Sequence, residues 1–113
     1  MSASLSGASF NRLIVDGIEA GKKAMVRYPQ PNYVISKFAE ESGEVVKAAI
    51  HFAEGRETAE NLRAEMVQAI GMLYRLWVEG DAVHGMEAVH NALLSGYEND
   101  GVPSWLKAKG ESE

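Results

Sequence analysis

Apolar residues recur at helical spacing in four segments of this 113-residue chain, and no stretch alternates apolar and polar residues for long enough to predict a strand. Short turn signals separate the four segments. We expect helices over about residues 10–27, 32–54, 58–80 and 82–95. Helices that are apolar on one side must bury that side against another element, so the pattern predicts an all-α fold, a four-helix bundle.

Local signals mark the ends of these helices. Ser9 is placed to cap the first helix, which should stop before residues 28–32, where two prolines disfavour helix. Gly55 should end the second helix, and Thr58 should begin the third. Asp81 is expected to cap the fourth helix.

The length predicts one domain over residues 1–113, because single domains commonly run to about 100–200 residues. We expect an ordered core from about residue 9 to 106, in which Trp105 and Leu106 dock against the bundle, followed by a loose tail.

Composition narrows the chemistry. The chain has no cysteine and only three histidines, so a metal would be held mainly by oxygen ligands, which favours magnesium or manganese over zinc. A net charge of −5 argues against binding along a nucleic-acid polymer. No apolar run approaches the roughly 18 residues of a membrane span, and the first nine residues do not look like a secretory signal. We therefore expect a cytoplasmic protein without a membrane partner.

Three glutamates of the second segment lie on or beside its apolar side. On a helical wheel Glu41 falls in the middle of the apolar stripe, Glu44 at its edge and Glu40 just beyond. Gly43 costs about 1 kcal/mol in mid-helix, which suggests that another segment packs closely there. The stripe consists of Val34, Phe38, Val45, Ala48 and Phe52.

The third segment repeats this arrangement. Glu65 is surrounded by apolar residues on its wheel, and Gln68 lies at the edge, as Glu44 does relative to Glu41. Buried carboxylates are expected to be paired or to coordinate metals, so two such helices could offer a magnesium ion several oxygen ligands. The surrounding residues are Leu62, Ala69, Met72, Leu73 and Leu76.

Ordinary surface pairing is the competing interpretation. Ion pairs with Lys37 and Lys47 would explain Glu40 and Glu44 equally well, contributing about 0.2–0.5 kcal/mol each. They do not explain Glu41 and Glu65, which lie at the centres of the stripes. For these two, salt bridges to a neighbouring helix are the alternative to a metal.

At these residues the chain resembles the MazG-like family of nucleotide pyrophosphohydrolases. The family signature is two adjacent glutamates, a third glutamate three residues after the second, and a later Glu-x-x-Asp pair. Here Glu40, Glu41 and Glu44 match the first half, while Glu65 and Gln68 stand at the positions of the second. The resemblance spans about residues 10–95 and includes the lead-in Arg27 to Asn32.

The resemblance implies an enzyme that hydrolyses a nucleoside or deoxynucleoside triphosphate to the monophosphate and pyrophosphate. It implies that Glu41, Glu44, Glu65 and Gln68 hold magnesium, with manganese as a possible substitute, and that the chain forms a bundle of the MazG-like type. Glu41 and Glu40 would be the catalytic pair, with Glu40 orienting or deprotonating the attacking water.

Gln68 departs from the family, whose aspartate at this position is a metal ligand. An amide oxygen can still ligate, but without charge. Glu79 or Asp81 could be recruited instead, although Asp81 is first a candidate helix cap and Glu79 a candidate surface residue.

Basic and aromatic residues supply candidates for binding the substrate. The phosphate-binding candidates are Lys22, Arg27, Arg63 and Arg75, and the base-binding candidates are Asn11, Tyr33 and Trp77. Lys23 is a further candidate for binding the phosphates, although most exposed basic residues serve only to keep a protein soluble.

The third segment is apolar beyond any single side, which predicts a homodimer or a dimer of dimers. Two other functions stay open. One is a non-catalytic helical module whose metal site is degenerate at Gln68. The other is a narrower hydrolase, such as a dUTP pyrophosphatase or a phage enzyme that trims dGTP or dATP pools.

Overall fold

The computed structural model describes residues 8–97, and within them the regular structure is helical apart from a single bridge between Asp81 and Met86. This confirms the all-α prediction. Trp105, Leu106 and the tail lie outside the described residues. The elements are α2 (Phe10–Arg27), α3 (Val34–Ala53), α4 (Ala59–Val78), the 3-10 turn η1 (Ala82–His84) and α5 (Val89–Tyr97).

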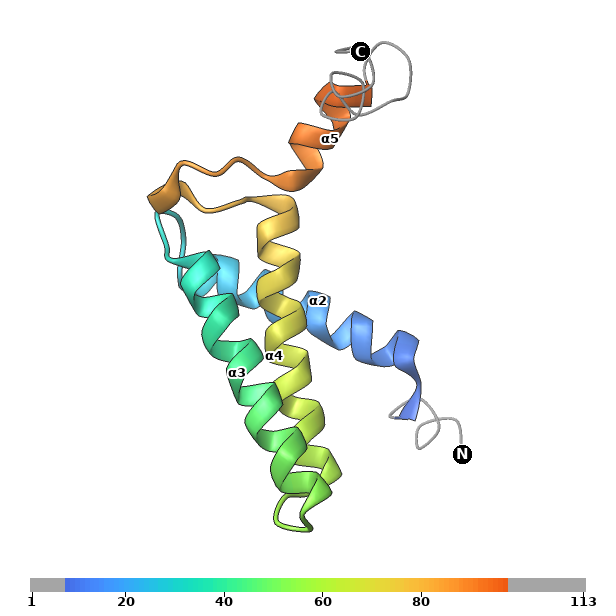
Figure 1. The fold of residues 1–113 in the computed structure, drawn as a ribbon. Coiled ribbons are helices and arrows are strands. Elements are labelled where there is room, and N and C mark those ends of the chain that lie inside the picture. Colours follow the sequence, from blue (N-terminus) through green and yellow to red (C-terminus); the bar gives the residue numbers. More distant parts are fainter. Residues whose placement is uncertain (1–7, 98–113) are drawn as a thin grey trace, which may run out of the picture.

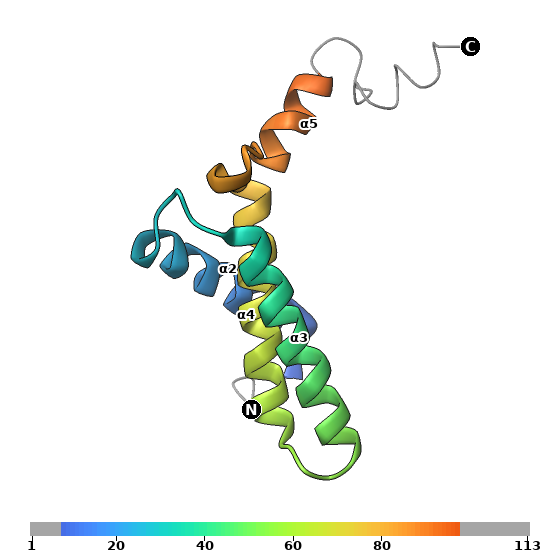
Figure 2. The same ribbon diagram turned by 60° about the vertical axis from the view of Figure 1, so that its left-hand side comes forward.

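Helix α4 is the centre of the fold. Helices α3 and α4 lie side by side as an antiparallel hairpin, and α2 crosses α4 at a steep angle (Figure 1, Figure 2). Helix α5 contacts α4 and projects away from the other three (Figure 1). The described residues therefore contain four α-helices, as predicted, and α2, α3 and α5 each pack against α4.

Two of the predicted caps are confirmed. The Ser9 side chain accepts a hydrogen bond from the backbone N–H of Arg12 at 3.2 Å, and the Thr58 side chain accepts one from Asn61 at 3.1 Å. Gly55 follows α3 with φ of +75°, a conformation that glycine adopts without strain. Each signal works through atoms within a few residues, which is why the sequence identifies it.

The predicted helix over 82–95 is wrong in its first half. Asp81 caps only the three-residue turn η1, and Gly85 then leaves the helical region with φ of +69°. Asp81 and Met86 exchange two backbone hydrogen bonds of 2.9 Å, which fold the chain back on itself. Helix α5 consequently begins at Val89.

Glycines set the crossing of α2 over α4. A Cβ atom added to Gly21 would lie 2.7 Å from the carbonyl oxygen of Gly71, and one added to Gly17 would lie 2.2 Å from the Ile70 side chain. Only glycine allows the backbones to approach this closely. Close packing at Gly43, which we expected from the sequence, is not found, because a Cβ there would meet no atom within 4 Å.

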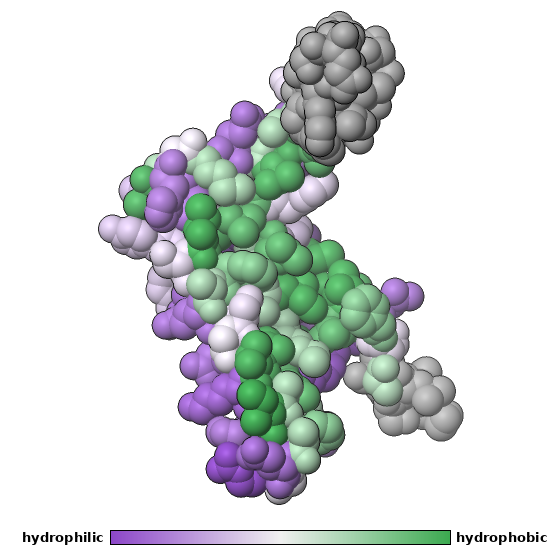
Figure 3. All heavy atoms as spheres, in the orientation of Figure 1, coloured by the Kyte–Doolittle hydropathy of each residue, from purple (hydrophilic) through white to green (hydrophobic). Residues whose placement is uncertain are grey.

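The predicted stripes are buried only in part. Val34, Ala48 and Met72 are buried, but Phe52 is 46% exposed and Leu73 is 53% exposed. The crossing helix α2 leaves the far end of the hairpin uncovered, where Phe52 lies (Figure 1). Apolar side chains gather on the visible surface over α2 and α4 (Figure 3). No helix in residues 8–97 is long and apolar enough to cross a membrane.

Candidate functional site

A pocket of 300 Å³ lies where the first half of α3 and the second half of α4 meet the end of α2. Glu41 and Lys37 reach it from α3, Gln68 and Arg75 from α4, and Tyr28 from the loop after α2. We call this the hairpin pocket. It brings two of the predicted metal ligands, Glu41 and Gln68, together from segments far apart in the sequence.

Glu41 is half-buried and its pKa is raised. Desolvation is the main cause, and the charges of Glu40, Glu65 and Glu44 add to it, while Lys37 opposes them. Glu41 therefore lies in the field of all three other motif glutamates. Bringing like charges together is costly, and a bound cation would relieve that cost.

The other motif glutamates are placed differently. Glu40 is exposed and its carboxylate accepts a 2.7 Å hydrogen bond from Lys37, which is the surface pairing weighed above. Glu44 is exposed as well, and Glu65 on α4 is half-buried. Only Glu41 of the three α3 glutamates lines the hairpin pocket.

The hairpin pocket offers oxygen donors that suit a hard cation, but its acidic side chains do not form a metal-binding cluster. Within residues 8–97 no three or more His, Cys, Asp or Glu side chains stand close enough to hold a metal ion. A magnesium ion at the hairpin pocket would draw on the Glu41 carboxylate and the Gln68 amide oxygen, whereas Glu65, the third candidate ligand, does not line this pocket. All three are oxygen donors of the kind that magnesium accepts.

Glu79 and Asp81, the acids considered as substitutes, are engaged elsewhere. Glu79 pairs with the Nε of Arg75. Asp81 is fully buried and accepts hydrogen bonds from the backbone N–H groups of Ile35 at 2.8 Å and His84 at 3.1 Å. Desolvation opposes its ionisation, but these bonds and the His84 imidazole outweigh that effect and lower the pKa of the carboxyl.

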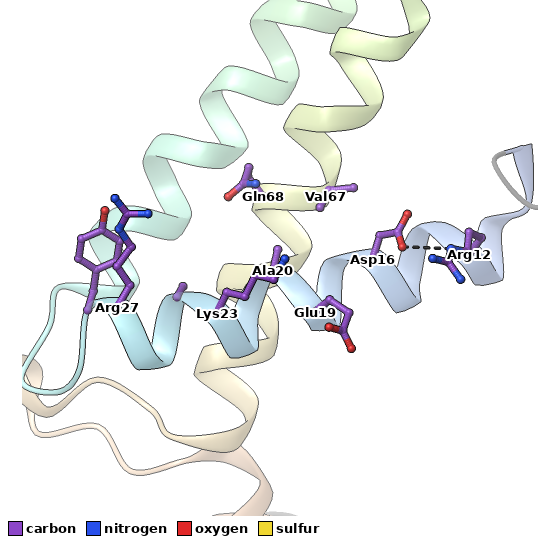
Figure 4. Close-up of a pocket in the computed structure, with 10 residues that line it drawn as sticks. Arg12, Asp16, Glu19, Ala20, Lys23, Arg27, Val67 and Gln68 are labelled. Atoms are coloured by element: carbon purple, nitrogen blue, oxygen red, sulfur yellow. Dashed lines mark ion pairs between the residues drawn. The ribbon is translucent and has the colours of Figure 1, made fainter.

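A second, larger pocket of 640 Å³ runs along α2 on the side of α4 (Figure 4). It shares Ala24, Tyr28 and Gln68 with the hairpin pocket, so the two are continuous at Gln68. We call it the α2 groove. Lys23 and Arg27 line it at one end, and Arg12, Asp16 and Glu19 line it toward the start of α2.

Two of the four predicted phosphate-binding residues line a pocket, and two line neither. Arg27 lines the α2 groove, but Lys22 lines neither pocket, and its neighbour Lys23 takes the place expected for it. Arg63 pairs with Asp16 at 2.9 Å. Arg75 lines the hairpin pocket, although its guanidinium is also bound to protein groups.

The predicted base-binding residues are not brought together. Asn11 is exposed in the first turn of α2. Tyr33 stands edge-on to His84 in the loop before α3, and Trp77 lies on an apolar surface of α4 beside His90. The structure instead places Asn32 and Tyr28 at the hairpin pocket, and the loop position of these two residues is the only sequence signal for them.

Comparison with protein-family models, with curated proteins and with solved structures found no match.

Proposed function

We propose that this chain is a magnesium-dependent pyrophosphohydrolase, which converts a nucleoside or deoxynucleoside triphosphate to the monophosphate and pyrophosphate. The observation that carries the proposal is the hairpin pocket, where Glu41 and Gln68 come from two helices and lie beside Lys37 and Arg75. A carboxylate with a raised pKa next to basic side chains suits a metal-bound phosphate ester.

In the reaction, water attacks the α phosphorus, the bond from that phosphorus to the bridging oxygen breaks, and pyrophosphate leaves. Glu41 would orient the water and accept its proton from its place in the hairpin pocket. Magnesium, when bound, would neutralise charge on the phosphates and acidify the water. Lys37 would contact phosphate oxygens from the same pocket.

Glu40 receives a different role in this proposal from the one that the resemblance implies. Its carboxylate pairs with Lys37 on the exposed side of α3 and is not among the residues that line the hairpin pocket. We assign Glu40 to positioning Lys37 and assign the proton transfer to Glu41.

We also propose that the working form is a homodimer or a dimer of dimers. Helices α2 and α4, the segment before α5 and the first residue of α5 share an apolar face, formed by Ile14, Ile18, Ile70, Leu73, Tyr74, Leu76, Trp77, Met86 and Val89. Trp77 is 46% exposed on this face, and exposed apolar patches of this kind commonly mark interfaces. Within residues 8–97 few apolar side chains are fully buried, so a second copy would add the missing core.

A substrate panel tests the proposed activity. The purified protein is incubated with magnesium and each of the common ribonucleoside and deoxynucleoside triphosphates, dUTP included, and pyrophosphate release is measured. We expect release from at least one of them and none without magnesium. No release from any, together with no magnesium binding by calorimetry, would favour the non-catalytic module instead.

A further inference from the structure

Ion pairs occupy most basic side chains of the described chain, but not those at the end of α2. Arg12, Lys37, Arg56, Arg63 and Arg75 each pair with a carboxylate. For the remaining basic residues of segment 8–97 the structure shows no ion pair, and three of these four lie in the last six residues of α2. They are Lys22, Lys23, Arg27 and Lys47.

Lys23 and Arg27 differ from Lys22 and Lys47 in what they face. Both line the α2 groove, together with Gln68 of α4 (Figure 4). They stand one helical turn apart, so their side chains leave α2 on the same side, with about 5–6 Å between the Cβ atoms. The Arg27 guanidinium also lies 5.7 Å from the centre of the ring of Tyr28, one of the three residues that both pockets share.

The charge of the α2 groove changes along its length. At the end near the start of α2, Asp16 and Glu19 are acidic, and Asp16 already holds both Arg12 and Arg63. At the other end two cations stand without a carboxylate partner, in the groove that Gln68 also lines. In a chain of net charge −5, this is a local reversal of sign that would favour an anion at one end of the groove only.

We propose that Lys23 and Arg27 form a binding site for two adjacent phosphate groups, a site that receives the pyrophosphate part of the substrate. That the ligand belongs to a nucleotide rests on the proposed function; that the site binds condensed phosphate does not. Two cations one turn apart contact neighbouring phosphates at once, and the arginine fork bonds phosphate oxygens in pairs. Orthophosphate engages one cation fully and binds more weakly.

The site also gives the substrate a direction. The two pockets meet at Gln68, with Glu41 on one side and Lys23 and Arg27 on the other. A triphosphate whose terminal phosphates lie in the α2 groove would place its α phosphate in the hairpin pocket, where Glu41 is the base. The bond that breaks would then lie between the two pockets.

Calorimetry on the full chain in metal-free buffer of low ionic strength tests the site. The probes are inorganic pyrophosphate, tripolyphosphate and orthophosphate. We expect tripolyphosphate and pyrophosphate to bind at least about tenfold more tightly than orthophosphate, and the double variant K23Q/R27Q to lose at least about tenfold of that affinity. The matched control K22Q/K47Q removes the same charge from the other two unpaired lysines and should change the affinity by less than about twofold.

Equal losses of affinity in the two double variants would show that phosphate is attracted by net charge only, and would overturn the site. A parent protein that binds none of the probes would overturn it as well. Circular dichroism of both variants checks that they remain helical. The proposed activity can fail separately: a parent that binds tripolyphosphate but hydrolyses no nucleotide keeps the site and loses the enzyme. A K23Q/R27Q variant with the parent's affinity and KM loses the site and keeps the enzyme.

Discussion

The buried guanidinium of Arg75 donates a hydrogen bond from Nη2 to the carbonyl oxygen of Tyr28, at 2.8 Å. Its Nε is bound to Glu79, the residue that follows α4. The contact with Tyr28 joins the central helix to the end of α2, where the hairpin pocket opens. Arg75 was a candidate for binding phosphate, and these contacts give it a structural role at the same place.

Arg75→Met should therefore lower the free energy of unfolding by about 3 kcal/mol, because it leaves a half-buried carboxylate and a backbone carbonyl without their donor. Urea denaturation measures the change. The control is Arg56→Met, which removes an exposed pair with Glu54 and should cost less than about 1 kcal/mol. A loss at Arg75 no larger than the control's would refute the structural role.

Two glycines should respond to alanine with opposite signs. Gly21→Ala places a methyl group against the Gly71 carbonyl oxygen and should destabilise the protein by about 1–3 kcal/mol. Gly43→Ala meets no atom within 4 Å and should stabilise α3 by about 0.5–1 kcal/mol. Urea midpoints of the two variants decide it, and a stabilising Gly21→Ala would mean that α2 does not cross α4 at this point.

The apolar face should control self-association. Leu73→Glu introduces a charge where the proposed interface needs apolar contact, and we expect it to shift the protein toward monomer in sedimentation velocity runs across a range of concentrations. Val26→Glu is the matched control, because Val26 is 84% exposed on α2 and does not belong to this face. A parent that is monomeric throughout, or an equal effect of both variants, would contradict the dimer.

Stability without metal should depend on the ionisation of Glu41. Because its pKa in the folded state lies above the ordinary 4.5, the folded protein keeps a proton that the unfolded chain has lost, and stability falls as pH rises through that interval. Glu41→Gln lacks this loss. In metal-free buffer the melting temperature of the variant should rise relative to that of the parent as the pH increases from 4 to 7. A difference in melting temperature that stays constant over this range would contradict the raised pKa.

The sequence-based predictions that rest on local signals are the ones that the structure confirms. Ser9 and Thr58 cap their helices through bonds to residues three positions along, and helical periodicity placed Glu41 toward the interior. The break at Gly85 was missed, because the turn depends on backbone bonds between Asp81 and Met86 that no periodicity reveals.

A helical wheel could not have chosen between Lys22 and Lys23. Gly17 and Gly21 mark the side of α2 that meets α4, but Lys22 and Lys23 flank that side in opposite directions, each roughly 120–140° away from it at 100° per residue. The sequence alone does not say that glycines, rather than large apolar residues, form the contact. Which side of α2 faces the groove therefore became clear only from the crossing.

The most direct test of the proposed function is phosphorus NMR of a hydrolysable triphosphate, incubated with magnesium and the parent, Glu41→Gln, Glu65→Gln or Glu60→Gln. Glu60 is the control, an exposed glutamate in the first turn of α4 that lines neither pocket. We predict monophosphate and pyrophosphate from the parent and the control, and a rate at least about a hundredfold lower for the other two. Full activity of Glu41→Gln, or nucleoside diphosphate and orthophosphate as the first products, would contradict the account.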